Sequence, residues 1–224
     1  MNASIVTLVI AAATGISLPA QADCGCAAWL LTTQVAEGKP YIVVEGVCMP
    51  TAARLVLSDP FGKSVPLSLL TTHTGYNGNV QYVVTPDRAI APGKHALTIG
   101  APSESSRHEL IVAPAVANAT PPTWNGAATV LGQTQTEFGC GPAKSVNVQA
   151  GADASLAFVE LVDAAKKRTG YVRVDAGKLS IGHHMCSGAF ELVKGRAYTA
   201  TVTLLAPARG TSSTSKTASF TYSP

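Results

Sequence analysis

Along most of the chain, short segments alternate apolar, often β-branched residues with polar ones at a period of two. This alternation is typical of β-strands that bury one face. Glycine, proline, aspartate and serine separate the segments and predict turns between them. Helical periodicity is weak, and only residues 27–35 leave a short helix and a first strand as alternatives. The clearest predicted strands span residues 41–47, 54–58, 80–85 and 95–99 in the first half, and 146–149, 158–162, 171–174, 198–204 and 218–222 in the second.

The alternation stops in residues 112–123, a segment that is rich in proline, alanine and threonine and carries no charge. Such a composition predicts an extended and fairly stiff linker. A chain of 224 residues has room for two ordinary domains, each with its own core. We therefore expect a first domain at residues 23–112, a linker at 113–124 and a second domain at 125–224.

Two matched segments occur in the same order in both halves, which indicates a duplicated unit. Residues 54–59 align with residues 159–163, and each segment is a strand that runs into a turn started by an aspartate. Residues 90–94 align with residues 192–196, and each segment is an apolar residue, a glycine turn and a following strand. Alternating strands with a repeat of roughly 100 residues indicate a pair of seven-stranded β-sandwiches.

The segment Leu192-Val-Lys-Gly-Arg-Ala-Tyr198-Thr-Ala-Thr-Val202 resembles the corner of fibronectin-III-like and bacterial immunoglobulin-like domains. In such domains the tyrosine hydroxyl bonds the backbone near the corner while its ring packs inside. Residues 86–93 carry a fainter version, which is followed by His95 and Leu97 and by no tyrosine. The resemblance implies an all-β fold with two immunoglobulin-like β-sandwich domains in tandem. It also implies the roles that such domains serve in exported bacterial proteins, as spacers, adhesion modules or binding surfaces.

Residues 1–22 are typical of a cleavable secretory signal peptide. An apolar run from Ile5 to Leu18 is followed by a proline and by Ala20-Gln21-Ala22, which puts small residues where a signal peptidase reads. The four residues before the run lack the usual Lys or Arg, and Asp23 just before Cys24 argues against a lipoprotein signal. The run is shorter than the about 20 residues that cross a bilayer. We therefore expect an exported protein, periplasmic or extracellular, with no stable membrane span in the mature chain.

Charged residues make up 13% of the chain and apolar residues 46%, a balance that favours a folded protein over a disordered one. The net charge of +3 comes from scattered basic residues. Only Lys166, Lys167 and Arg168 are adjacent, and they fall where a hairpin turn is expected. The composition therefore gives no support to nucleic-acid binding.

All five cysteines lie after residue 22, where an exported protein would keep them in disulfides. Cys140 and Cys186 are the only cysteines of the second half, so we expect them to pair with each other. Cys48 is then expected to pair with Cys24 or Cys26, and the other of those two is a free thiol, an intermolecular bridge or an exchanging partner. The pair Cys24-Gly-Cys26 is also compatible with a redox site or a soft-metal clip. A structural disulfide is favoured because nothing beside the pair resembles a helix N-terminus.

Residues 182–186, Gly-His-His-Met-Cys, concentrate imidazole, thioether and thiol donors, a ligand set that suits copper. His183, His184 and Met185 are therefore candidate copper ligands. Adjacent side chains on a strand point to opposite faces, so His183 and Met185 would share one side and His184 the other. We favour a disulfide-bearing strand or loop with exposed histidines and no cofactor, and a copper site is the alternative. The remaining histidines all lie in the other domain: His73, His95 and His108.

Catalytic motifs are weak in this chain. Ser180, Ser187 and Ser212 lack the Gly-x-Ser-x-Gly context of a nucleophile elbow. Trp29 and Trp124 are candidates for stacking on a sugar, although a tryptophan in a small sandwich more often packs in the core or at a domain interface. Several carboxylates fall where turns would use them, and paired carboxylates for glycoside hydrolysis are unsupported. These carboxylates are Asp59, Asp87, Asp153 and Asp163.

The sequence as a whole indicates an exported, non-enzymatic binding or structural module of the bacterial cell envelope or exterior. Its partner is an unknown protein or glycan. The alternative hypothesis is a periplasmic copper-binding protein that uses the His-His-Met-Cys segment.

Overall fold

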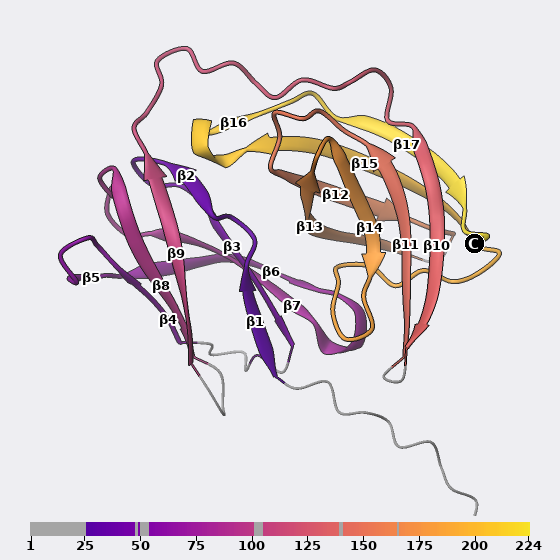
Figure 1. The fold of residues 1–224 in the computed structure, drawn as a ribbon, viewed down its shortest axis with the longest axis horizontal. Coiled ribbons are helices and arrows are strands. Elements are labelled where there is room, and N and C mark those ends of the chain that lie inside the picture. Colours follow the sequence, from indigo (N-terminus) through magenta and orange to yellow (C-terminus); the bar gives the residue numbers. More distant parts are fainter. Residues whose placement is uncertain (1–25, 48, 50–53, 101–104, 139–140, 165) are drawn as a thin grey trace, which may run out of the picture.

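The computed structural model describes residues 26–47, 49, 54–100, 105–138, 141–164 and 166–224 (Figure 1). Within these residues the chain is all-β, with short 3-10 turns and no α-helix. No helix in the described part of the chain is long and apolar enough to cross a membrane. The predicted signal peptide at residues 1–22 lies outside the described residues.

Strands β1–β9 form two facing sheets, here called the N-terminal unit, with the strand orders β1-β3-β7-β6 and β2-β9-β8-β4-β5. The orders β1-β3-β7-β6 and β4-β8-β9 match the ABED and CFG sheets of a constant-type immunoglobulin domain. The buried side chains between the two sheets form one apolar core. The strands are β1 (Ala27–Leu30), β2 (Gln34–Ala36), β3 (Ile42–Val47), β4 (Arg54–Ser58), β5 (Ser64–Val65), β6 (Leu67–Thr74), β7 (Val80–Pro86), β8 (Gly93–Gly100) and β9 (Ser105–Ala113).

Strands β10–β17, here called the C-terminal unit, follow one hydrogen-bonded path, β10-β11-β14-β13-β12-β15-β16, with β17 also paired to β15. The long strand β13 joins two layers, because it pairs with β12 over most of its length and with β14 only at Val174 and Asp175. Side chains from both layers share a second apolar core. The strands are β10 (Val130–Phe138), β11 (Gly141–Gln149), β12 (Leu156–Val162), β13 (Lys167–Asp175), β14 (Lys178–His183), β15 (Ala197–Ala206), β16 (Thr211–Ser212) and β17 (Lys216–Thr221).

The N-terminal unit buries the outer face of its sheet β1-β3-β7-β6 against the C-terminal unit. All six residues of β3 are buried for this reason: Val44 faces the core of its own unit, and Val43 faces the other unit. Val83 of β7 and Leu156 of β12 complete a third, smaller apolar cluster between the units. Figure 1 shows the units side by side, with the connection from β9 to β10 running over them.

No strand occurs between β9 and β10, where the linker is predicted. Its second half packs along the C-terminal unit. The backbone nitrogen of Thr123 donates to Asp153, and Nε1 of Trp124 donates to Ser213 Oγ at 3.2 Å and to the backbone oxygen of Thr214 at 3.0 Å. Trp124 also packs against the core of that unit, so this tryptophan has the packing role and not the sugar-stacking one.

All nine predicted strands are present. Residues 27–35 form β1 and the start of β2, so the strand interpretation of that segment is confirmed and the helix is wrong. The basic trio is misplaced in part, since only Lys166 lies in the turn while Lys167 and Arg168 begin β13. The sequence pattern also missed four long strands: β6, β9, β10 and β14.

The aspartate turns of the predicted repeat are both present. Oδ1 of Asp59 accepts from the backbone nitrogens of Phe61 at 3.0 Å and Lys63 at 2.8 Å. Oδ1 of Asp163 accepts from the backbone nitrogen of Lys166 at 3.0 Å. Both carboxylates therefore stabilise the turn that follows the equivalent strand, β4 or β12.

The predicted tyrosine corner is confirmed. The hydroxyl of Tyr198, at the start of β15, accepts from the backbone nitrogen of Val193 at 2.9 Å, and the ring is buried. At the equivalent place in the N-terminal unit, Nε2 of the buried His95 lies 2.9 Å from the backbone oxygen of Ala91. Because a carbonyl only accepts, Nε2 carries the proton and donates. His95 thus makes the backbone hydrogen bond at the position where the tyrosine is missing.

Candidate functional site

The side chain of Gln81 joins the two units by acting on β13 as a neighbouring strand would. Its Nε2 donates to the backbone oxygen of Tyr171 at 2.8 Å, and its Oε1 accepts from the backbone nitrogen of Tyr171 at 2.7 Å. In the described part of the chain, β14 pairs with β13 only from Val174 onward, so Gln81 takes the place of a strand here. Nε2 of Gln81 also donates to Oε2 of Glu45 at 2.7 Å. Gln81, only 1% exposed, therefore satisfies buried backbone groups of the other unit.

A second contact joins the 3-10 turn η1 (Tyr76–Gly78) to the loop after β14. The backbone nitrogen of Tyr76 donates to the oxygen of Gly188 at 2.9 Å. The Tyr76 ring stacks on His183, with ring centroids 3.6 Å apart and planes 17° apart. A Cβ at Gly75 would collide with the Gly188 oxygen. The turn can therefore approach the loop this closely only because residue 75 has no side chain.

Aromatic rings fill the remaining space between the units. The ring centroid of Tyr171 lies 5.6 Å from His73, 5.2 Å from Phe158 and 6.3 Å from Tyr41. Nδ1 of His73 lies 2.8 Å from Oγ1 of Thr169 in the other unit. Burial, assisted by the neighbouring Tyr171, raises the pKa of Tyr41 to about 12. His73 is thus part of the packing between the units.

A cleft of about 550 Å³ opens beside this contact, and both units line it. The wall from the N-terminal unit consists of Trp29 and Leu31 at β1 and Glu45 of β3. Trp29 is 38% exposed, a large value for an indole in a small domain. The volume falls in the range of small-molecule sites, and such sites often lie where two domains meet.

The floor of the cleft is the outer face of the sheet β10-β11-β14-β13. Side chains of one face alternate along each strand, and here the outward positions carry hydroxyls: Thr134 and Thr136 on β10, Ser145 on β11 and Ser180 on β14. Phe138, 48% exposed, stands at the end of β10. The inward positions of the same strands belong to the apolar core and include Val146, Val148, Leu179 and Ile181.

Burial favours the neutral forms of two ionisable side chains of the cleft, Glu45 and His183. Burial raises the pKa of the Glu45 carboxyl, against the hydrogen bond that Gln81 donates to it, and Glu45 is 9% exposed. Burial lowers the pKa of the His183 imidazole. The guanidinium of Arg173 donates to the backbone oxygen of Leu30 in the other unit.

His183 has one ring nitrogen without a partner. Nδ1 lies 2.8 Å from the backbone oxygen of His184 and must donate to it. Nε2 of the neutral ring is then an acceptor, and it has no hydrogen-bond partner although the residue is only 4% exposed. Buried acceptors in this state are rare and mark places that take a water or a ligand.

The structure separates the three candidate copper ligands. Strand β14 ends at His183, so the strand geometry assumed for His184 and Met185 is wrong. His183 is buried against Tyr76, whereas His184 and Met185 are exposed in the loop that follows. Within the described residues, no group of three or more His, Cys, Asp or Glu side chains is placed to hold a metal ion.

Two of the cysteines lie in the described residues. Cys186 is bonded in a disulfide, and its predicted partner Cys140 lies outside those residues. Cys26 is a free, exposed thiol. Cys24 and Cys48 lie outside the described residues, so the pairing of Cys48 stays a prediction.

The other sequence candidates have structural roles. Oδ1 of Asp87 accepts from the Ser68 hydroxyl, and Asp153 pairs with Arg209 at 3.3 Å. Nε2 of His108 lies 3.0 Å from the Ser106 hydroxyl. Of the three serines, Ser180 and Ser187 line the cleft, and Ser212 lies in β16.

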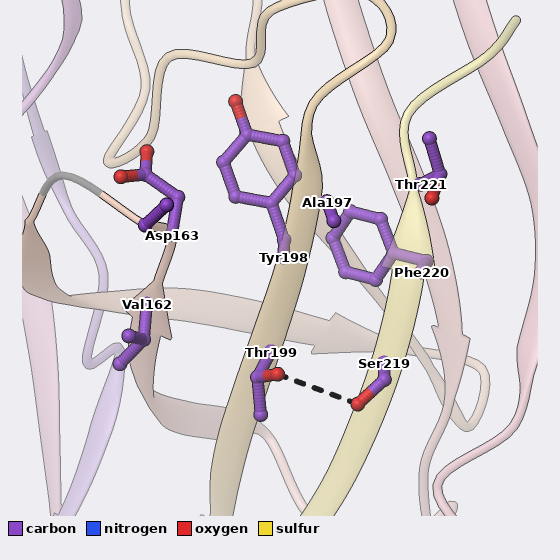
Figure 2. Close-up of a pocket in the computed structure, with 9 residues that line it drawn as sticks. Val162, Asp163, Ala197, Tyr198, Thr199, Ser219, Phe220 and Thr221 are labelled. Carbon is purple, nitrogen blue, oxygen red and sulfur yellow. Dashed lines mark hydrogen bonds between the residues drawn. The ribbon is translucent and has the colours of Figure 1, made fainter.

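A second depression lies over β15 and β17 (Figure 2). Its floor includes Thr199 and Ser219, whose hydroxyls lie 3.4 Å apart. The carboxylate at its rim belongs to Asp163, which pairs with Arg168 at 3.1 Å and Arg196 at 3.3 Å. The two arginines and the turn already bond this carboxylate, so it is less available to a ligand than the polar groups of the cleft between the units are.

No protein-family model matches the chain, and no curated protein matches it. Similar solved structures include a pullulanase from Anoxybacillus sp. LM18-11, at 14% identity and a TM-score of 0.29, which matches 82% of this chain and 24% of its own. A two fibronectin type III domain segment from chicken tenascin has 13% identity and a TM-score of 0.26, covering 83% of this chain and 94% of its own.

A chimeric titin Z1Z2 carrying an exogenous peptide from decorin has 13% identity and a TM-score of 0.27, over 85% of this chain and 91% of its own. This chain spans about a quarter of the pullulanase chain. TM-scores this low do not indicate a function for this chain. The strand order within the units, and not these likenesses, supports an immunoglobulin-like fold.

Proposed function

We propose that the protein is an exported, non-enzymatic binding module in which two immunoglobulin-like domains hold a ligand in the cleft between them. The observation that carries the proposal is the lining of the cleft. Both units contribute to it: the exposed Trp29 lines it, and so does His183, a residue whose Nε2 has no hydrogen-bond partner. Unmet hydrogen-bonding capacity and an exposed indole in one concave site favour a ligand over a spacer role.

A binding role fits the serines and histidines of the cleft better than catalysis does. Nucleophilic catalysis requires a histidine nitrogen that accepts from the serine hydroxyl and a carboxylate that orients the ring. In the described residues, Nδ1 of His183 is occupied by the backbone of His184, and Nε2 bonds no serine. Glu45 is engaged by Gln81 and is held toward its neutral form.

Export and an oxidising location are part of the proposal. The apolar run and small-residue site in residues 1–22 support it, as does the disulfide at Cys186, since disulfides persist outside the cytosol. The test is intact mass and N-terminal sequencing of the protein recovered from the periplasm or medium. A mature chain that begins at Asp23 and contains disulfides is expected, and an uncleaved, fully reduced chain in the cytosol contradicts the export part.

The binding part is tested by amide chemical shifts of the mature protein. Fractions of the cell envelope, separated into peptides and glycans, are added to labelled protein. We expect a binding fraction to shift amides of β1, β10 and the loop after β14 together, because these segments line one cleft. Binding that shifts only amides remote from the cleft contradicts the proposal.

A further inference from the structure

The floor of the cleft offers an array of small hydroxyls. Thr134, Thr136, Ser145 and Ser180 project from neighbouring strands of one sheet face. The Thr134 and Ser145 hydroxyls lie 2.8 Å apart, so they already form a hydrogen-bonded pair. A hydroxyl both donates and accepts, and it carries no charge. Such an array is complementary to a ligand whose own polar groups also donate and accept.

The sides of the cleft offer apolar surfaces. Trp29 and Phe138 are both large, both partly exposed, and belong to different units. A flat ring that carries C–H groups on one face and hydroxyls around its edge can stack on an aromatic side chain while its edge bonds the floor. Pyranose sugars have this construction, because their axial C–H bonds form an apolar face.

The charge of the lining favours a neutral ligand. Arg173 carries the one fixed positive charge and already donates to the other unit. The carboxyl of Glu45 and the imidazole of His183 are both held toward their neutral forms by burial. An acidic polysaccharide would meet no free cluster of basic groups here, and a basic peptide would meet no ionised carboxylate cluster.

His183 adds an acceptor that has no partner in the protein. Its Nε2 is buried, and the residue lines the cleft. A ligand hydroxyl can supply the missing donor, whereas a purely apolar ligand would leave the nitrogen unsatisfied at a cost.

We infer that the cleft binds a neutral saccharide, with a sugar ring stacked on Trp29 and its hydroxyls bonded to the threonines and serines of the floor. The inference rests on the proposed function and names the ligand class of the same site. A peptide in extended conformation is the main competitor, since Ser and Thr hydroxyls also bond backbone groups. The experiment below distinguishes the two.

The mature protein is screened on an array of neutral and acidic oligosaccharides, and the binders are titrated by tryptophan fluorescence. The chain has two tryptophans, of which Trp124 is hydrogen-bonded into the C-terminal unit. The emission change should therefore come from Trp29 and be absent in Trp29→Phe. Trp29→Ala is expected to weaken binding by about tenfold or more, as for the loss of one stacked ring.

Thr136→Val tests the floor, since it removes a hydroxyl at constant shape and should also weaken binding. Phe61→Ala is the matched control, because Phe61 is 95% exposed on the turn before β5, outside the lining of the cleft. It should bind as the wild type does. Melting curves and amide spectra establish that each variant is folded.

The saccharide inference is overturned if no neutral oligosaccharide binds, if acidic ones bind better, or if Trp29→Ala binds unchanged. In those cases the proposed function is judged separately. If a peptide shifts the same cleft amides, the cleft is still the binding site, but its ligand is a peptide and not a saccharide. If ligands shift only amides elsewhere, both the saccharide inference and the proposed binding site are wrong.

Discussion

Gln81→Met tests whether the two units are held in one arrangement by a single side chain. The substitution keeps the length of the side chain and removes the bonds to Glu45 and to both backbone groups of Tyr171. Each net hydrogen bond contributes about 1 kcal/mol, and a buried backbone group left without a partner costs about 1–3 kcal/mol. We expect a loss of about 3–5 kcal/mol from the contact between the units, allowing for partial rehydration.

The sharpest readout is hydrogen exchange at the backbone amide of Tyr171, because this amide donates to Gln81. Its protection should fall by more than about 100-fold in Gln81→Met, which corresponds to the lower end of the expected loss. Urea unfolding should change from one transition to two as the units uncouple. Gln149→Met is the control, since Gln149 is half-buried and its side chain donates one bond, to the backbone oxygen of the exposed Asn125; a change within about 0.5 kcal/mol is expected.

Unchanged protection of the Tyr171 amide in Gln81→Met would refute this reasoning, because the other contacts between the units would then set their arrangement. Equal effects of Gln81→Met and Gln149→Met on unfolding would lead to the same conclusion.

Three further substitutions test the contacts that shape the fold and the cleft. Tyr198→Phe should lower the free energy of unfolding by about 1 kcal/mol in urea, through loss of the bond from Val193. The pKa of Glu45 is raised above its ordinary value of 4.5 in the folded protein. Between the ordinary pKa and the raised one, the native state therefore binds more protons than the unfolded chain does. The free energy of unfolding falls as the pH rises through that interval. Glu45→Gln should flatten this slope in melting curves recorded from pH 4 to 8, and an unchanged slope would contradict the assignment. Gly75→Ala should push the turn off Gly188 and enlarge the molecule in small-angle scattering, while each unit keeps its own strands.

The strands were predictable where one face is apolar and the other polar. Residues 54–58 and 198–204 show this alternation and lie in β4 and β15. Strand β10 was missed because its central residues 132–137, Gly-Gln-Thr-Gln-Thr-Glu, carry no apolar side chain, and none of its nine residues is buried. A strand whose outer face lines a hydroxyl-rich cleft gives no hydrophobic period to detect.

The contact between the units did leave a signal in the sequence. Residues 42–44 and 82–84 are apolar without interruption, which is typical of strands buried on both faces. The polar residues that follow or precede them, Glu45 and Gln81, then fall on the interface side by alternation. The sequence pattern does not identify the residue that Gln81 bonds in the other unit, since only the fold places Tyr171 opposite Gln81.

The copper hypothesis rested on the donor types of the His-His-Met-Cys segment, of which only His183 lies in a strand. Gly182 has a φ of +150° and lies against the backbone of Lys144, and the chain then turns so that the nitrogen of His184 donates to the oxygen of Ser187. The donors of the His-His-Met segment therefore separate. Sequence proximity of ligand types does not specify a site when a glycine and a turn intervene.

The polar contacts between the units cost more than apolar ones would, and this cost bears on function. Burying Glu45, Gln81 and His183 gains little stability over apolar side chains of similar size, because each must be desolvated first. Directional hydrogen bonds do, however, specify one angle between the units, whereas apolar contacts tolerate several. A cleft with one shape binds its ligand without a further cost for ordering the two domains. A module built to bind in the cleft gains from this arrangement, and a passive spacer does not.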